Sequence, residues 1–171
     1  FNGNGNGEIF VLGTNPGGYG LQIEQWDNSL VFLKSGGPQV GSGVAIADTN
    51  WHHIAVTKMG TRIVFYVDGV AYPAPPTDMG LFTFSAPGYI GGWLNPFGVV
   101  DNSFYGMIDD LAIYARELSA SEIGAIYQAG SMGKCVQPVA PTIISQPTSQ
   151  IAFVTGSAAF SVTATGTVPL S

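Results

Sequence analysis

The feature that most constrains this fold is an apolar segment that ends in an Asp-Gly pair. Residues 62–67 read Arg-Ile-Val-Phe-Tyr-Val, and successive side chains of a strand point to opposite faces. Val64 and Tyr66 lie opposite the other apolar side chains, so both faces of this strand are predicted to be covered. Asp68 and Gly69 follow directly, and such a pair favours a type I′ hairpin because glycine tolerates positive φ.

Similar short apolar runs, separated by turn signals, recur along most of the chain. One clear turn signal is Asn-Pro-Gly-Gly at residues 15–18. The runs predict strands over residues 19–24, 29–34, 44–47, 53–58, 81–84 and 89–92, and a long strand over residues 104–115. The pattern therefore predicts an all-β fold.

One short helix interrupts the strands. Ser119 and Glu122 have the spacing of a capping box, in which each side chain bonds a free backbone amide of the other residue. Leu118 and Ile123 have the spacing of the hydrophobic staple that accompanies such a start. Gly130 is a typical stop. We expect this helix to pack on an end or an edge of the β-structure.

Composition limits the class of protein and of partner. Hydrophobic residues make up 46% of the 171 residues and charged residues only 9%, a balance common in exported β proteins. The net charge is −6 and the five lysines and arginines are scattered, so nucleic acid is not an expected partner. No apolar run is long enough to span a membrane. We expect an extracellular or cell-surface protein whose signal peptide lies outside this chain.

Three segments, taken in order, resemble the laminin-G-like branch of the concanavalin A-like jelly rolls. They are Trp-His-His-Ile-Ala-Val-Thr at 51–57 continuing to Phe-Tyr-Val-Asp-Gly at 65–69, Tyr-Ile-Gly-Gly at 89–92, and Phe-Tyr-Gly-Met-Ile-Asp-Asp-Leu-Ala-Ile-Tyr-Ala-Arg-Glu-Leu-Ser at 104–119. The resemblance implies a two-sheet antiparallel jelly-roll sandwich with one short C-terminal helix over residues 1–134. It also implies further N-terminal strands that this chain does not include.

The end of the chain is predicted to belong to a different unit. Residues 135–142 contain Pro138 and Pro141 and are expected to form a linker, in which Cys135 is the single cysteine. Residues 143–171 resemble the start of a bacterial immunoglobulin-like domain, on Pro-Thr-Ile-Ile-Ser-Gln-Pro at 141–147 and Phe-Ser-Val-Thr-Ala-Thr-Gly at 160–166. We therefore expect a fragment of a second β-sandwich.

Aromatic residues in polar loops are the candidates for ligand binding. Aromatic faces stack on the apolar faces of sugar rings, while neighbouring amides bind the hydroxyl groups. Trp26 lies in a polar turn and Trp93 in a Gly-rich loop, and Tyr19 and Tyr105 are further candidates. The alternative for each tryptophan is that it plugs an end of the sandwich.

Calcium is the candidate cofactor, since relatives of this fold often hold it. Calcium prefers oxygen ligands from carboxylates, amides and backbone carbonyls. Asp109 or Asp110 is the first candidate ligand, and Asp101 and Asn102 in the preceding loop could add oxygens. The alternative is that Asp109 or Asp110 accepts backbone amide hydrogen bonds and fixes the local chain.

Catalysis is not expected. A glycoside hydrolase needs two carboxylates flanking the scissile bond, and adjacent strand residues such as Asp109 and Asp110 point to opposite faces. Glu24 and Asp27 are separated by a predicted turn and lack a third partner. The sequence therefore predicts a non-catalytic extracellular module that binds a polysaccharide or cell-surface glycan. The alternative is an adhesion or spacer module that binds other extracellular protein domains, and a hydrolase fragment is the least favoured class.

Overall fold

The computed structural model describes residues 6–13, 17–83, 87–94, 97–130 and 140–166. The chain divides into two compact units, residues 1–130 and residues 131–171, and each is described by itself. Cys135 and most of the predicted linker lie outside the described residues.

The first layer of unit 1 is a five-stranded antiparallel sheet in the order β4-β3-β2-β1-β8. Its strands are β1 (Gly7–Leu12), β2 (Tyr19–Ile23), β3 (Ser29–Lys34), β4 (Gln39–Ala45) and β8 (Gly88–Ile90). Alternation assigns the two faces: Leu21, Ile23 and Phe32 belong to the buried core between the sheets, whereas Gln22 and Val31 point the other way.

The second layer is a three-stranded antiparallel sheet of β5 (Ile54–Met59), β6 (Arg62–Val67) and β7 (Val70–Pro73). Ile63 and Phe65 of β6 are fully buried in the core shared with the first sheet. Val64 and Tyr66 are buried on the other face, in a second cluster with helix residues, so the predicted covering of both faces is confirmed. Asp68 and Gly69 have φ values of 51° and 79°, as the predicted hairpin turn requires.

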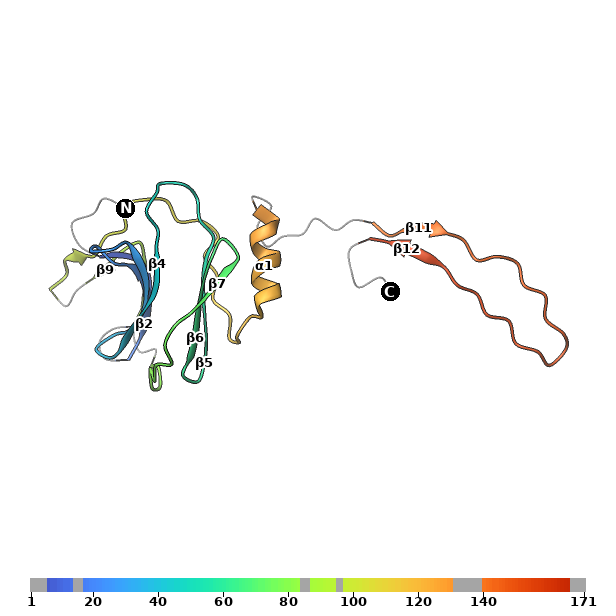
Figure 1. Ribbon diagram of the computed structural model, residues 1–171, viewed down its shortest axis with the longest axis horizontal. Helices are drawn as coiled ribbons and strands as arrows, with labels where there is room; N and C mark the ends of the chain where they lie inside the picture. Colours follow the sequence, from blue (N-terminus) through green and yellow to red (C-terminus); the bar gives the residue numbers. More distant parts are fainter. Residues whose placement is uncertain (1–5, 14–16, 84–86, 95–96, 131–139, 167–171) are drawn as a thin grey trace. The chain divides into compact units, whose positions relative to one another are not determined.

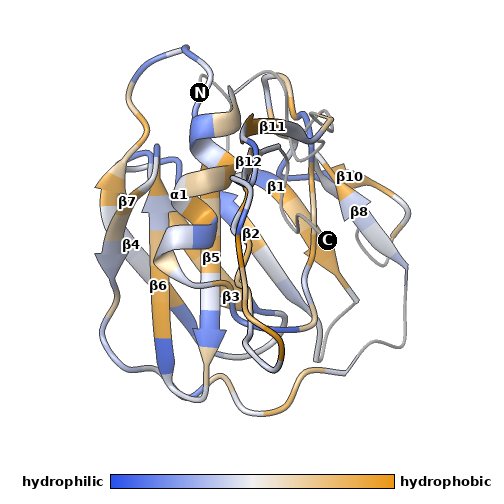
Figure 2. Ribbon diagram, turned by 90° about the vertical axis from the view of Figure 1, so that its right-hand side faces the viewer, coloured by the Kyte–Doolittle hydropathy of each residue, from blue (hydrophilic) through white to orange (hydrophobic). Residues whose placement is uncertain are grey.

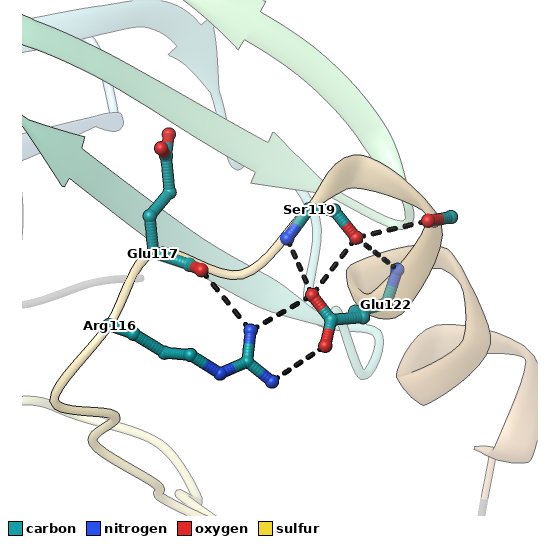
Figure 3. Close-up of polar contacts among 5 residues, drawn as sticks. Arg116, Glu117, Ser119 and Glu122 are labelled. Carbon is teal, nitrogen blue, oxygen red and sulfur yellow. Dashed lines mark hydrogen bonds and ion pairs between the residues drawn. The ribbon is translucent and has the colours of Figure 1, made fainter.

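Helix α1 (Ala120–Ala129) covers the outer face of the second sheet, not an end or an edge as predicted, because Ile123 packs on the central strand β6 (Figures 1 and 2). Both bonds of the predicted capping box are present, since the Ser119 Oγ accepts from the Glu122 amide and the Glu122 carboxylate accepts from the Ser119 amide. Arg116 donates to the same carboxylate (Figure 3). Ile123 is 1% exposed and packs with Leu118, as the staple predicts.

The predicted long strand over residues 104–115 is not present, and this prediction is wrong. The segment forms no strand, its Phe104 amide donates to the Gly91 carbonyl at 2.9 Å just after β8, and Asp110 has a φ of 50°. The predicted strand over 81–84 is also absent over its described residues 81–83, where Leu81 is 87% exposed. A short hairpin of β9 (Trp93–Leu94) and β10 (Val100–Asp101) precedes the extended segment.

In residues 140–166, the described part of unit 2, there is one antiparallel strand pair, β11 (Thr142–Ser145) and β12 (Thr163–Thr165). Its described apolar side chains are largely exposed; Ile151 and Phe153 are 98% and 89% accessible. Two short strands cannot enclose a core. The assignment of this unit to an immunoglobulin-like domain stays a prediction.

Candidate functional site

Several connections of unit 1 meet at one end of the sandwich, called the loop end below. It comprises residue 6, the β2–β3 turn (24–28), the β4–β5 connection (46–53), the β6–β7 turn (68–69) and residues 101–103. Antiparallel pairing brings these turns to the same end, and backbone bonds join neighbouring connections within each sheet. The Ile46 amide donates to the Asn28 carbonyl at 2.8 Å, and the Asp68 amide donates to the His53 carbonyl at 2.9 Å. The β4–β5 connection crosses the top of the molecule in Figure 1.

A polar cluster lies beside the loop end, on the face of the first sheet that points away from the core. It consists of Asn6, Glu8, Gln22, Glu24 and Asn102. Glu8 and Gln22 are cross-strand partners on this face, and the Gln22 Nε2 donates to the Glu24 carboxylate at 3.0 Å. The Glu8 amide donates to the Asn102 carbonyl at 2.8 Å, and the Asn102 side chain bonds the Glu8 carboxylate. The Asn6 Oδ1 accepts from the Gln25 amide at 3.2 Å.

Glu8 is the most perturbed carboxyl group of the cluster. It is only 5% exposed, and its Oε2 atom has no hydrogen-bond partner among the described residues. Burial disfavours the charged form and raises the pKa of Glu8 from its ordinary value of 4.5 to about 7, with a smaller contribution from the negative charge of Glu24. The Asn102 bond opposes this rise. The polar cluster therefore contains a buried carboxyl group that is partly ionised near neutral pH.

Two tryptophans of the loop end project into solvent. Trp26 is 84% exposed and Trp51 is 63% exposed. The turn that carries Trp26 is fixed because the Asp27 carboxylate accepts from the Ser29 amide at 2.8 Å. Neither indole belongs to a hydrophobic core cluster, so neither plugs the end of the sandwich.

His52 fixes the connection that carries Trp51. Its Nδ1 lies 2.8 Å from the Asp68 carboxylate and its Nε2 lies 2.9 Å from the Asp48 carboxylate. These hydrogen bonds, first that to Asp68, raise the pKa of His52, because a protonated imidazole donates to both carboxylates at once. The second Asp68 oxygen accepts from the His53 amide at 2.9 Å. The loop is therefore held in place before any ligand arrives.

Charge is divided between the two ends of unit 1. Glu24, Asp27, Asp48 and Asp68 lie at the loop end. The four lysines and arginines of the described ranges lie at the other end: Lys34 ends β3, Lys58 is near the end of β5, Arg62 begins β6, and Arg116 pairs with Glu122 at the start of α1. The loop end is thus acidic.

The predicted sugar-binding residues do not all lie together. Trp26 is at the loop end, and Trp93, half-buried, is the cross-strand partner of Asp101. Tyr105 is 65% exposed in the segment that follows Asn102. Tyr19 begins β2 at the opposite end of that strand, where its ring contacts Phe10, Phe32 and Phe82 at 4.9–5.9 Å. Tyr19 is therefore separated from Trp26 by the length of β2.

The predicted calcium ligands fall into two places. Asp101 and Asn102 are beside the polar cluster, and Asn102 is bonded to Glu8. Asp109 and Asp110 are exposed, and the Asp109 carboxylate accepts from the Asp110 amide at 2.9 Å, which is the alternative role considered for this pair. Within the described ranges, no three His, Cys, Asp or Glu side chains are grouped as metal ligands. Calcium binding through carboxylate, amide and backbone carbonyl oxygens stays a prediction.

A pocket of about 330 Å³ lies at the opposite end, where α1 begins. It is lined by Arg62, Tyr66, Glu117, Leu118, Ser119, Ala120 and Glu122. Its charged groups are already paired, since Arg62 contacts Glu117 and Arg116 contacts Glu122, each at 2.6 Å. The Arg116–Glu122 pair holds the start of the helix (Figure 3), so the loop end is the stronger candidate for a binding site.

Sequence reasoning missed Glu8, Gln22 and Trp51 as members of the site. Glu8 and Gln22 look like ordinary polar positions of alternating strands, and only the pairing of β1 with β2 brings them together. Trp51 stands in a segment that resembles the family, and the resemblance gives it no binding role. The signal available in the sequence is its position directly after the polar residues Asp-Thr-Asn at 48–50.

Comparison with known proteins gives one family. A family model described as the concanavalin A-like lectin/glucanases superfamily matches residues 2–124. The 2.1 Å crystal structure of an S-layer domain-containing protein from Clostridium thermocellum is 29% identical, with a TM-score of 0.41; the match covers 74% of this chain and 65% of that one. No curated protein matches the chain. Within the described residues, no helix has the length and apolar character to cross a bilayer.

Proposed function

Because the chain belongs to the concanavalin A-like lectin/glucanase superfamily, we propose that unit 1 is a non-catalytic, extracellular carbohydrate-binding module. The observation that supports this most is the loop end, where exposed Trp26 lies on a fixed turn next to the polar cluster. An indole face packs on the apolar face of a sugar ring, and amide and carboxylate groups bind its hydroxyls. The low content of charged residues, 9%, is the ground for an extracellular location.

The carboxylates of the loop end support a binding role better than a hydrolytic one. A hydrolase needs two carboxyl groups that both reach the scissile bond. Glu8, the carboxyl group whose pKa is raised to about 7, is 5% exposed and hydrogen-bonded to Asn102. It has no access to a glycosidic oxygen in this arrangement. Calcium, with Asp101 and Asn102 as the better placed of the predicted ligands, is retained as a proposed accessory ion.

Binding of the intact chain to a polysaccharide panel, by affinity electrophoresis with and without calcium, tests the proposal. Trp26→Ala is expected to weaken binding about tenfold, since aromatic contacts at the centre of an interface contribute 1 kcal/mol or more. Leu81→Ala is the control, because Leu81 is 87% exposed near the opposite end. Failure to bind any glycan with or without calcium, or equal effects of the two substitutions, would contradict the proposal and favour a spacer module.

A further inference from the structure

We propose that His52 is a proton-operated latch: as an imidazolium it ties the β4–β5 connection, which carries Trp51, to the β6–β7 turn, and as a neutral imidazole it releases that connection. The inference concerns the shape of the loop end and does not depend on the ligand proposed above. It makes the placement of an exposed tryptophan depend on pH.

The two ring nitrogens of His52 supply the first part of the argument. Nδ1 lies 2.8 Å from Oδ2 of Asp68, and Nε2 lies 2.9 Å from Oδ1 of Asp48. An ionised carboxylate only accepts hydrogen bonds, so each contact needs an N–H on the imidazole ring. A neutral imidazole has one N–H, whereas an imidazolium has two. Both hydrogen bonds therefore exist together only while His52 is protonated.

Asp48 is the partner that separates when the proton leaves. Asp68 is held without His52, since its Oδ1 accepts from the His53 amide and its own amide donates to the His53 carbonyl, each at 2.9 Å. The Asp48 side chain is 54% exposed, against 35% for Asp68. A neutral ring that keeps its proton on Nδ1 keeps the Asp68 bond and turns the lone pair of Nε2 toward the Asp48 carboxylate, which repels it.

The Asp48–His52 bond ties the exposed part of the connection to the fold. Among the described residues, it is the one hydrogen bond that joins residues 47–51 to the rest of the chain. The bond from the Asn50 amide to Asp48 lies within that stretch. Residues 47–51 are all exposed, so packing holds them weakly. Loss of the Asp48–His52 bond therefore frees Trp51 together with the four residues before it.

Within the described residues, no second cation stands in for the imidazolium. Hydrogen bonds to Asp68 and then to Asp48 raise the pKa of His52, and the charges of the same two carboxylates add to this. His53, the next residue, has its ring beside that of Tyr127 in α1, with the centroids 6.0 Å apart. The four described lysines and arginines lie at the other end of unit 1. Deprotonation therefore leaves two carboxylates beside a neutral ring without a counter-charge.

The sign of the pH dependence follows from these contacts. The folded state favours the imidazolium, so the latch is closed below the ordinary histidine pKa of 6.5. It opens as pH rises through the raised pKa of His52. The loop end is therefore ordered at mildly acidic pH and has a mobile Trp51 at alkaline pH.

Nuclear magnetic resonance of the intact chain from pH 5.5 to pH 9 tests the latch without any substitution. The ring protons of His52 report its protonation, and carbon-13 relaxation of the Cα atoms of residues 49–51 reports their motion without relying on exchangeable protons. We expect order parameters of about 0.85, typical of rigid backbone, at pH 5.5 and below about 0.6 at pH 9. The midpoint should equal the pKa of His52, and the turn that carries Trp26 should stay rigid throughout.

Two substitutions at the latch should give opposite results. His52→Gln should leave residues 49–51 mobile at both pH values, because its amide group donates from one end only. Asp48→Asn keeps the oxygen that accepts from the Asn50 amide, and it should make the order parameters independent of pH. The reason is that a neutral amide can accept from an imidazolium or donate to a neutral ring.

Two control substitutions address the other groups that titrate in this range. His53 is the second of the two histidines of the chain, and the pKa of Glu8 is about 7. His53→Gln and Glu8→Gln should each leave the transition of residues 49–51 in place. A transition that disappears in Glu8→Gln, or that persists in His52→Gln, would assign it to another group and overturn the proposal. Order parameters of the parent chain that stay high up to pH 9 would also overturn it, whether or not the variants fold.

Discussion

Substitution Glu8→Gln is expected to stabilise unit 1 at alkaline pH and to have little effect at acid pH. A carboxyl group whose pKa is raised on folding favours the folded state when protonated, so its contribution is fully present below the unfolded value. That contribution is lost as pH rises through the folded value. For Glu8 this window runs from 4.5 to about 7. Glutamine is isosteric and uncharged, and its amide oxygen keeps an acceptor for Asn102.

The size of this effect follows from burial. Each pKa unit corresponds to about 1.4 kcal/mol, so the rise from 4.5 to about 7 amounts to roughly 3 kcal/mol of destabilisation above pH 8. Unfolding entropy of about 2.1 cal/mol/K per residue gives about 0.27 kcal/mol/K for unit 1, residues 1–130. The expected gain in Tm is therefore about 10 °C at most.

Thermal unfolding followed by circular dichroism at pH 4 and at pH 8.5 checks this prediction. The difference in Tm between Glu8→Gln and the parent chain should be near zero at pH 4 and positive at pH 8.5. Glu24→Gln is the control, because Glu24 is only half-buried and its substitution should raise Tm at pH 8.5 much less. If Glu8→Gln lowers Tm at pH 8.5, the carboxylate has a partner or counter-charge that the burial argument omits.

Three further substitutions probe the loop end and the helix. His52→Ala should lower the free energy of unfolding by roughly 1 kcal/mol below pH 6.5, the ordinary pKa of histidine, because the imidazolium donates to both Asp48 and Asp68. The loss of Tm should shrink as pH rises through the raised pKa of His52. A loss of Tm that grows with pH would contradict this. Ser119→Ala should lower the urea midpoint by the equivalent of about 1 kcal/mol through loss of the cap, and an unchanged midpoint would show that Arg116 and Glu122 suffice. Gly69→Ala should lower Tm more than Gly43→Ala, because both have positive φ (79° and 68°) but only a Cβ at Gly69 meets Tyr127, at 2.9 Å.

The parts of the fold that the sequence predicts well are those in which local pattern and final environment agree. Strand β6 is apolar at every position after Arg62, which requires cover on both faces, and α1 together with the first sheet provides it. The capping box and staple of α1 lie within six residues of one another, so their geometry follows from spacing alone.

The sequence predictions that were wrong or missing concern residues whose environment is set by strands distant in the sequence. Alternation over residues 104–115 favours a strand, but alternation does not say which strand lies alongside, and the left-handed backbone at Asp110 interrupts the extended run. Tyr19 looked like a loop aromatic, yet the pairing of β2 with β1 and β3 places it among Phe10 and Phe32. Glu8 became part of the candidate site through the pairing of β1 with β2 and the backbone bond to Asn102.

Titratable groups at the loop end divide into two sets with different tasks. Hydrogen bonds from the Ser29 amide lower the pKa of Asp27, and those from the Asn50 amide and His52 lower the pKa of Asp48, so both exposed carboxylates stay ionised well into the acid range. Glu8 and His52 have raised pKa values and take up protons first as pH falls. Mild acidification therefore strengthens the scaffold while the Asp27 and Asp48 carboxylates stay charged. Asp27 and Asp48 also hold their own turns, through the Ser29 amide and His52, so an amide substitution that keeps an acceptor oxygen is the way to remove the charge with the least loss of stability.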